Sequence, residues 1–549
     1  MRANRCGSSI RSAGIAWILL QALSALPANA SEPPSLTVQT ASGPVRGFSA
    51  NGVREFRAIP YAASTAGEKR WTAPVPPAPW TAPRDATQYR HGCPQVVRFD
   101  ATEASENEDC LHLNIAVPES APAGTPVLVW IHGGAWVGGS NDIYPIDYLA
   151  RETGLVVVAI NYRLGAFGFM PHPSFDPDAN GALGLEDQRL ALRWVQRNIA
   201  AFGGYPGTVT LAGESAGAAS VCLQLANPER AEGLFHRGII QSAGCTTPLR
   251  TVEEGEAAGL EFARELGCAN TGEELDCMRK APLARILEVQ TALAGRLSRA
   301  FSPSAGSAAL PRDGATALRT GKVLRMPLLN GGTRDEMRLY VGYEAVAGAK
   351  VTPQNYPDAL AARYGEHAAA VAQRYPSASY SSASTALGTA MSDFLPFAGI
   401  TNCQFLHTAR LASPLMPVYE YEFADRGAPP VMPDPGFELG AVHSAELAYF
   451  FPGFTNKRVF DGPALASASR KLGTQMLAWW SAFARTGEPA VAGLPAWERF
   501  RSEDAVMRLD APAPQIYDAG REHQCGFWRS IYPGMLGAQS DKTRAAARG

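Results

Sequence analysis

The stretch VTLAGESAG, residues 209–217, decides the fold. Its apolar start, Val209–Ala212, has the character of a short buried strand, and the small residues from Ala216 to Ala226 are typical of a helix. The residues around Ser215 fit the G-x-S-x-G pattern, in which a serine stands on a sharp strand-to-helix turn. Glycine suits the flanking positions because close packing there leaves no room for a Cβ. We therefore interpret Ser215 as a nucleophile.

Around this stretch, apolar runs alternate with a helical pattern. Four continuous apolar runs suit strands buried on both faces of a parallel sheet: Val127–Ile131, Leu155–Ile160, Val209–Ala212 and Gly238–Gln241. Leu185–Phe202 has apolar residues at helical spacing and completes a strand–helix–strand unit. These patterns predict an α/β fold with a large central, mostly parallel sheet flanked by helices. Glu253–Leu297 and Ala464–Arg485 are expected as further helical segments.

A glycine-rich loop directly follows the first of these strands. It reads His132-Gly133-Gly134-Ala135-Trp136. A loop with few side chains can direct backbone N–H groups at a developing oxyanion. A plain Gly-Gly turn is the alternative, but the G-x-S-x-G stretch further along the chain favours the oxyanion role.

The acid and the base of such a site follow the serine in chain order, acid first. Four late histidines are candidates for the base: His367, His407, His443 and His523. His443 stands out because it lies between a loop rich in Pro and Gly and an apolar helix, and loops on a rigid scaffold often carry catalytic groups. The acid is expected after the short apolar run 326–330, where both Asp335 and Glu336 remain possible.

The chain resembles the type B carboxylesterase (cholinesterase-like) family of the α/β-hydrolase fold. The resemblance runs in order along nearly all of the chain after residue 30. It rests on these segments: Ile59–Ala62, Cys93–Gln95, Glu108–Asn114, Asn161–Gly165, Gly184–Gln188, Phe202–Gly204 and Gly213–Gly217.

The resemblance assigns roles to individual residues. It implies that His443 is the base and that Glu336 is the acid, although Met337 follows where the family has Gly. It implies that Glu214 is a buried carboxylate beside the site, and we expect its charge to tune His443. It also implies that the oxyanion donors are the N–H groups of Gly134, Ala135 and Ala216.

Eight of the nine cysteines lie beyond residue 30. The resemblance implies three disulfides: Cys93–Cys110, Cys268–Cys277 and Cys403–Cys525. Cys222 and Cys245 have no assigned partner; Cys222 is expected to be a buried thiol, and whether the two pair stays open. The resemblance further implies structural ion pairs of Arg70 with Glu108 and of Arg163 with Asp187. No C-x-x-C pair is present, which argues against a structural zinc site.

Residues 1–30 have the pattern of a signal peptide. Arginines precede the apolar segment Ala13–Leu26, and Ala28-Asn29-Ala30 is a small-x-small cleavage site, so the mature chain should begin near Ser31. The apolar segment is shorter than the ~20 residues that a spanning helix needs. We expect export to the periplasm or the medium without a stable membrane anchor, one catalytic domain over 31–537, and a polar tail over 538–549.

The composition excludes several classes of protein. Of the 549 residues, 46% are hydrophobic and 18% are charged, and the net charge of -2 comes without a run of Lys and Arg, so a nucleic-acid partner is not expected. The oligomeric state stays open. The sequence predicts an exported carboxylic ester hydrolase that acts on a small-molecule ester through an acyl-enzyme, with no metal or cofactor. An amide or carbamate hydrolase is the first alternative, and a non-catalytic binding protein is the second.

Two segments bear on the substrate. Gln95–Asp109 contains no tryptophan, which argues against choline specificity because the choline-binding members of the family carry one there. Phe301–Leu310 is rich in small residues and suggests a roomy or altered acyl pocket.

Overall fold

In the computed structural model, residues 36–97, 103–269, 272–297, 299–454 and 465–537 are described. From Leu36 onward they belong to one compact unit. The signal peptide expected over 1–30 and the tail expected over 538–549 lie outside the described residues.

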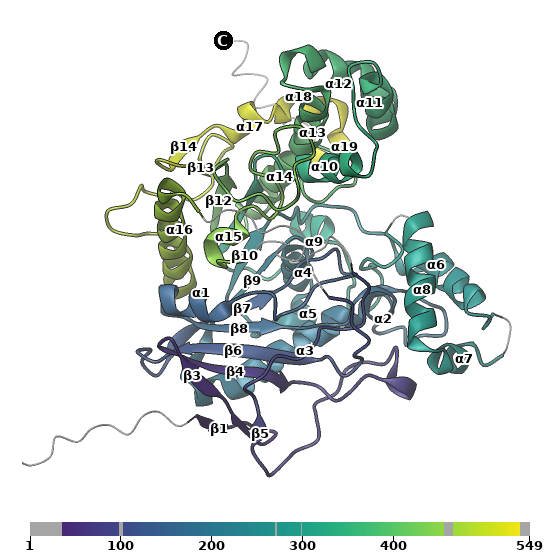
Figure 1. The fold of residues 1–549 in the computed structure, drawn as a ribbon, viewed down its shortest axis with the longest axis vertical. Coiled ribbons are helices and arrows are strands. Elements are labelled where there is room, and N and C mark those ends of the chain that lie inside the picture. Colours follow the sequence, from purple (N-terminus) through teal and green to yellow (C-terminus); the bar gives the residue numbers. More distant parts are fainter. Residues whose placement is uncertain (1–35, 98–102, 270–271, 298, 455–464, 538–549) are drawn as a thin grey trace, which may run out of the picture. The chain divides into compact units, whose positions relative to one another are not determined.

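A large sheet organises the fold (Figure 1). Among the described residues it has eleven strands, in the order β14-β13-β12-β11-β10-β9-β7-β8-β6-β4-β3. Their bounds are β3 Phe48–Ala50, β4 Val53–Pro60, β6 His112–Pro118, β7 Thr125–Ile131, β8 Val156–Ile160, β9 Gly204–Glu214, β10 Arg237–Gln241, β11 Leu328–Thr333, β12 Val418–Phe423, β13 Val506–Leu509 and β14 Gln515–Tyr517. The pairs from β8 across to β13 are parallel, and the outer pairs at both edges are antiparallel. The expected mostly parallel central sheet is therefore present.

A second, smaller sheet lies near the start of the described chain. It pairs β1 Thr37–Gln39 with β2 Pro44–Arg46, and β2 with β5 Arg84–Asp85.

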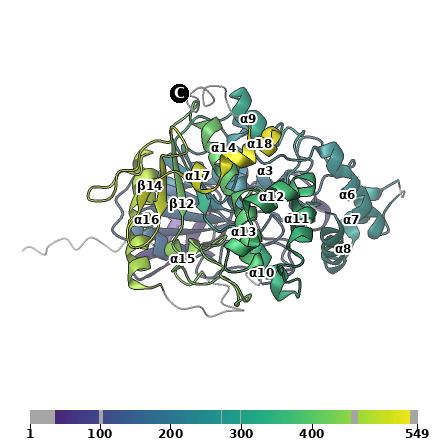
Figure 2. The same cartoon turned by 90° about the horizontal axis from the view of Figure 1, so that it is seen from above.

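Helices cover both faces of the large sheet. Those that precede β12 are α1 Ile146–Thr153, α2 Gly165–Phe169, α3 Leu183–Asn198, α4 Ala216–Leu225, α5 Pro228–Ala231, α6 Val252–Glu265, α7 Glu274–Lys280, α8 Leu283–Arg296, α9 Gly314–Thr320, α10 Arg338–Val346, α11 Tyr356–Tyr364, α12 Ala368–Arg374, α13 Ala383–Asp393 and α14 Asn402–Ala412. Those that follow it are α15 Leu447–Phe450, α16 Ser467–Thr486, α17 Ala519–Glu522, α18 Cys525–Ile531 and α19 Pro533–Leu536. Figures 1 and 2 show α6, α7 and α8 grouped on the side away from α16.

The central strands explain why the core has two parts. In β7, Val127, Val129 and Ile131 join one cluster, while Leu128 and Trp130 join the other. The first cluster also holds apolar residues of α3 and α4, and the second holds those of α1 and α16. A strand between two helical layers must be apolar at every position, because successive side chains point to opposite faces. The continuous apolar runs in the sequence follow from this arrangement.

Among the described residues, four disulfides tie the loops to this framework. The bonds Cys93–Cys110, Cys268–Cys277 and Cys403–Cys525 are present. Cys222 is also bonded, to Cys245, so the expected buried thiol is wrong. This fourth bond joins α4, which follows Ser215, to the loop after β10. The expected ion pairs also form: Arg70–Glu108 at 2.6 Å and Arg163–Asp187 at 2.7 Å.

Candidate active site

Ser215 lies at a strained turn between β9 and α4. Its backbone has φ 57° and ψ -124°, a left-handed geometry that residues with a side chain rarely adopt. A Cβ at Gly217 would lie 2.0 Å from the carbonyl oxygen of Ile131, and one at Gly213 would lie 2.5 Å from the carbonyl carbon of Gly217. Both positions therefore need glycine, and the packing holds the serine on its turn.

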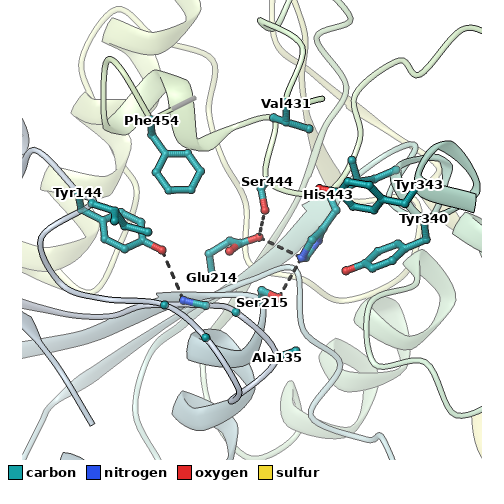
Figure 3. Close-up of a pocket in the computed structure, with 16 residues that line it drawn as sticks. Ala135, Tyr144, Glu214, Ser215, Tyr340, Tyr343, Val431, His443, Ser444 and Phe454 are labelled. Atoms are coloured by element: carbon teal, nitrogen blue, oxygen red, sulfur yellow. Dashed lines mark hydrogen bonds and ion pairs between the residues drawn. The ribbon is translucent and has the colours of Figure 1, made fainter. Parts of the chain in front are cut away.

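His443 connects Ser215 to Glu336. Nε2 of His443 lies 2.9 Å from Oγ of Ser215 (Figure 3). Nδ1 of His443 lies 2.6 Å from Oε2 of Glu336. Both His443 and Glu336 are buried. The other oxygen of Glu336 accepts the backbone N–H of Thr333 at 2.8 Å, which fixes the carboxylate. The structure thus brings together three side chains that are far apart in the sequence.

Asp335 has other partners than His443. It accepts the backbone N–H of Ala441 at 3.0 Å and pairs with Arg338 at 3.1 Å and Arg426 at 3.3 Å. Of the two acids that the residue pattern leaves open, Glu336 is the one that contacts the imidazole.

The three remaining late histidines have partners elsewhere. His367 packs edge-on against Tyr532, and Nδ1 of His407 accepts a hydrogen bond from Arg410. His523 is buried between Asp393 and Glu422. Of the four candidates, His443 alone has a hydrogen bond to Ser215 within the described ranges.

The glycine-rich loop after β7 lies beside Ser215. A Cβ at Gly133 would lie 3.1 Å from the Cβ of Ser215. Gly134 has φ +107°, and a Cβ there would lie 2.2 Å from the carbonyl oxygen of Gly138. The N–H groups of Gly134, Ala135 and Ala216 have no acceptor among the residues that the structure describes. The loop can therefore offer free N–H groups at the serine.

Glu214 lies on the opposite side of the imidazole from Glu336. It is buried, and its Oε1 lies 3.3 Å from Nε2 of His443. The same oxygen accepts the hydroxyl of Ser444 at 2.7 Å (Figure 3). Burial raises the pKa of Glu214, while His443 and Ser444 work in the opposite direction.

Carboxylates dominate the electrostatics around the imidazole. Burial alone would lower the pKa of His443, but the carboxylates of Glu214 and Glu336 outweigh it and raise the pKa to about 9. Glu446 is a further buried carboxylate nearby; burial, Glu214 and Glu336 together raise its pKa to about 8. The site therefore favours the protonated imidazolium.

A cavity of about 160 Å³ opens at Ser215 (Figure 3). Backbone of the glycine-rich loop forms one side, and apolar side chains form the walls. The wall residues are Ile143, Tyr144, Leu339, Tyr340, Tyr343, Val431 and Phe454. No lysine or arginine is among the lining residues that the structure describes.

The sequence did not identify these walls. Leu339, Tyr340 and Tyr343 are on α10, directly after Glu336. Their closeness to Glu336 in the sequence is the signal that could have identified them as lining residues. Val431 and Phe454 come from loops that flank His443 in the sequence. The segment Phe301–Leu310, expected to shape an acyl pocket, contributes no residue to this cavity.

Two other kinds of site are absent from the described parts of the chain. No cluster of His, Cys, Asp and Glu there could hold a metal ion. No helix there is both long and apolar enough to cross a membrane.

Comparisons with known proteins show which family the chain resembles. The sequence model of the carboxylesterase family matches residues 34–528. The fumonisin B1 esterase of Sphingopyxis macrogoltabida is 32% identical over 522 residues, which cover 92% of each chain. The cholinesterase of Mus musculus is 32% identical over 562 residues, covering 96% of this chain and 91% of its own. The phenmedipham hydrolase of Pseudarthrobacter oxydans is 32% identical over 491 residues, covering 85% and 93%.

Solved structures show the same relationship. A thermophilic PNB esterase superposes with a TM-score of 0.74 at 30% identity and covers 89% of this chain and 99% of its own. A further PNB esterase structure has the same TM-score at 31% identity. The chain therefore belongs to the carboxylesterase family, with the α/β-hydrolase fold, and is a carboxylic ester hydrolase.

Proposed function

We propose that this enzyme cleaves carboxylic esters through an acyl-enzyme on Ser215, with His443 as general base and acid and Glu336 as its partner. The observation that carries the proposal is the continuous contact from Ser215 through His443 to Glu336, at 2.9 Å and 2.6 Å. These are the distances over which a proton can pass from a nucleophile to a base that a third group orients.

The steps follow from this arrangement. Oγ of Ser215 attacks the ester carbonyl carbon while Nε2 of His443 takes its proton. Collapse of the tetrahedral intermediate breaks the bond to the alkoxy oxygen, which receives that proton and leaves as the alcohol. Water, activated by His443, then attacks the acyl-enzyme, and the acid leaves as Ser215 regains its proton. Glu336 fixes the tautomer of the imidazole and stabilises the imidazolium.

The N–H groups of Gly134, Ala135 and Ala216 are proposed to bind the oxyanion. Support comes from their position beside Ser215 and from the absence of competing acceptors among the described residues. Removing one such donor typically costs about 3 kcal/mol of transition-state stabilisation.

A small ester without a negative charge is the substrate that the cavity supports best. Its walls are apolar, and no lysine or arginine among the described lining residues could pair with an anionic group. Amide and carbamate bonds are the alternative substrates for the same three side chains. A panel of matched esters, amides and carbamates with one acyl group separates these possibilities by kcat/KM.

Substitution of the nucleophile tests the proposal. Ser215→Ala should abolish turnover of a small p-nitrophenyl ester and the burst of p-nitrophenol that marks acyl-enzyme formation, because the bond to the acyl group cannot form. Ser481→Ala is the matched control: its hydroxyl donates to the carbonyl of Thr153 on α1, far from Ser215 in the chain. Turnover by Ser215→Ala near that of the control would refute the assignment.

We also propose that the enzyme is exported after cleavage near Ser31. The four disulfides support this, because such bonds persist in oxidising compartments. Sequencing the amino terminus of the protein recovered from the periplasm and from the medium tests both the cleavage site and the destination. Recovery of the full chain with Met1, in the cytoplasm and with free thiols, would contradict export.

A further inference from the structure

Ser444 has a backbone conformation that a serine would not ordinarily adopt. It directly follows His443 and has φ +67°, in the left-handed region that favours glycine. A non-glycine residue is kept in such a conformation where the surrounding structure demands it, and such positions cluster at functional sites. A role of the serine side chain would account for a residue other than glycine at this position.

The hydroxyl of Ser444 makes one specific contact. It donates to Oε1 of Glu214 at 2.7 Å, and that oxygen lies 3.3 Å from Nε2 of His443 (Figure 3). Glu214 is buried, with a side chain only 3% exposed, so it depends on a few protein donors to remain charged. Glycine at this position would relieve the backbone but would remove the donor.

We propose that Ser444 is a positioning residue that acts through Glu214: its hydroxyl holds the carboxylate ionised and in place beside Nε2 of His443. The inference rests on the proposed roles of Ser215 and His443. When His443 takes the proton of Ser215, an ionised Glu214 stabilises the imidazolium that forms. Ser444 thus contributes to catalysis without touching the reacting atoms.

Two further carboxylates and a tyrosine also face the imidazole. Glu336 comes from the turn before α10, Glu446 from the start of α15, and the ring of Tyr340 on α10 lies 5.9 Å away. Glu214 in turn faces Tyr144 as well as His443. The hydroxyl of Ser444 is bonded to Glu214, which is the carboxylate on the Nε2 side of the imidazole. Its removal should therefore weaken that carboxylate selectively.

The direction of the effect follows from the charges. A hydrogen bond to a carboxylate favours its ionised form, so loss of the hydroxyl raises the pKa of the buried Glu214. A Glu214 that is protonated more of the time stabilises the imidazolium less. The pKa of His443 then falls, and the acidic limb of kcat/KM against pH moves to lower pH. We expect kcat on the plateau to fall as well, by about tenfold, which is the scale of the free energy that a hydrogen bond to a charged group contributes.

The experiment compares Ser444→Gly, Ser444→Ala and wild type, with Ser481→Ala as control, using a p-nitrophenyl ester over a range of pH. Ser444→Gly should remain folded, because glycine suits φ +67°, and should be thermally more stable than Ser444→Ala, which keeps the strain without the hydroxyl. Both variants should show the shifted limb and the lower kcat with little change in KM. Ser481→Ala should show neither effect.

A double variant separates this role from a general loosening of the loop. In a Glu214→Gln background the carboxylate is gone, so adding Ser444→Gly should not move the limb further. A limb that moves equally in both backgrounds, or Ser444→Gly with an unmoved limb and kcat within twofold of wild type, overturns the proposal. Ser215→Ala is run alongside: if it remains active, the nucleophile assignment fails first, whereas an inactive Ser215→Ala with an unaltered Ser444→Gly refutes only the role of Ser444.

Discussion

Glu336 and His443 are joined twice. Oε2 of Glu336 lies 2.6 Å from Nδ1 of His443, and its backbone oxygen accepts the backbone N–H of His443 at 3.3 Å. The side-chain contact sets the tautomer of the imidazole, and the backbone contact ties together two loops that are far apart in the sequence. In the proposed mechanism, Glu336 would therefore position His443 as well as stabilise its charge.

Glu336→Gln should consequently lower kcat by about 10³- to 10⁴-fold, because an amide can donate to Nδ1 and so favour the wrong tautomer. Asp335→Asn should lower kcat by less than about tenfold, since Asp335 bonds Ala441, Arg338 and Arg426 rather than the imidazole. Steady-state kinetics on one ester checks both variants. The reverse order of the two effects would identify Asp335 as the acid.

The sequence identifies the chemistry of this site better than its shape. The G-x-S-x-G pattern and the Gly-Gly loop are readable because strained turns and close backbone contacts demand glycine at Gly213, Gly217 and Gly134. The choice between Asp335 and Glu336 is not readable from the residues alone, because it depends on which side chain points at His443. The resemblance to the family favours Glu336, which is the one of the two that contacts His443; its role as the acid stays a prediction.

The sequence likewise predicts some strands of the fold and not others. The central strands are apolar at every position because both faces are covered, so they stand out as runs. Strand β6 is fully buried but contains Asn114, whose side chain accepts the backbone N–H of Ala58 at an irregularity in the pairing of β4 with β6. No apolar run marks such a strand. The partner of Cys222 was likewise open, because spacing alone does not determine disulfide connectivity.

The activity should depend on a base that titrates at alkaline pH. The carboxylates of Glu214 and Glu336 raise the pKa of His443 to about 9, and only the neutral imidazole can accept the proton of Ser215. The value of kcat/KM should therefore rise with pH through this range and level off above it. Glu214→Gln removes a charge 3.3 Å from Nε2 and should move the rise to lower pH. A profile that is already flat below pH 6, or an unmoved profile in Glu214→Gln, would contradict this assignment.

Stability should depend on pH through His523, which lies outside the active site. Burial alone would lower its pKa, but contact with Glu422 and Asp393 raises it from 6.5 to about 10. A raised pKa means that the folded state binds the proton more tightly, so this stabilisation is complete below pH 6.5 and is lost as the pH rises to about 10. The free energy of unfolding should fall across that window.

His523→Gln isolates this contribution, because His443 also titrates in the same range. The difference in unfolding free energy between wild type and His523→Gln, measured by urea denaturation at several pH values, should shrink as the pH rises from 6.5 to 10. A difference that stays constant with pH would mean that His523 is not charged in the folded protein.

Loss of the Cys222–Cys245 disulfide should reduce stability and leave the chemistry intact. The bond spans 23 residues, for which the chain-entropy model gives about 3 kcal/mol, whereas Cys403–Cys525 spans 122 residues and should contribute about 5 kcal/mol. Urea denaturation should therefore show a smaller loss of stability in Cys222→Ala/Cys245→Ala than in Cys403→Ala/Cys525→Ala. Because Cys222 lies on α4 beyond the turn that holds Ser215, kcat at low temperature should stay near wild type for the first variant. A large fall in kcat without loss of stability would instead show that this bond helps to hold the nucleophile turn in place.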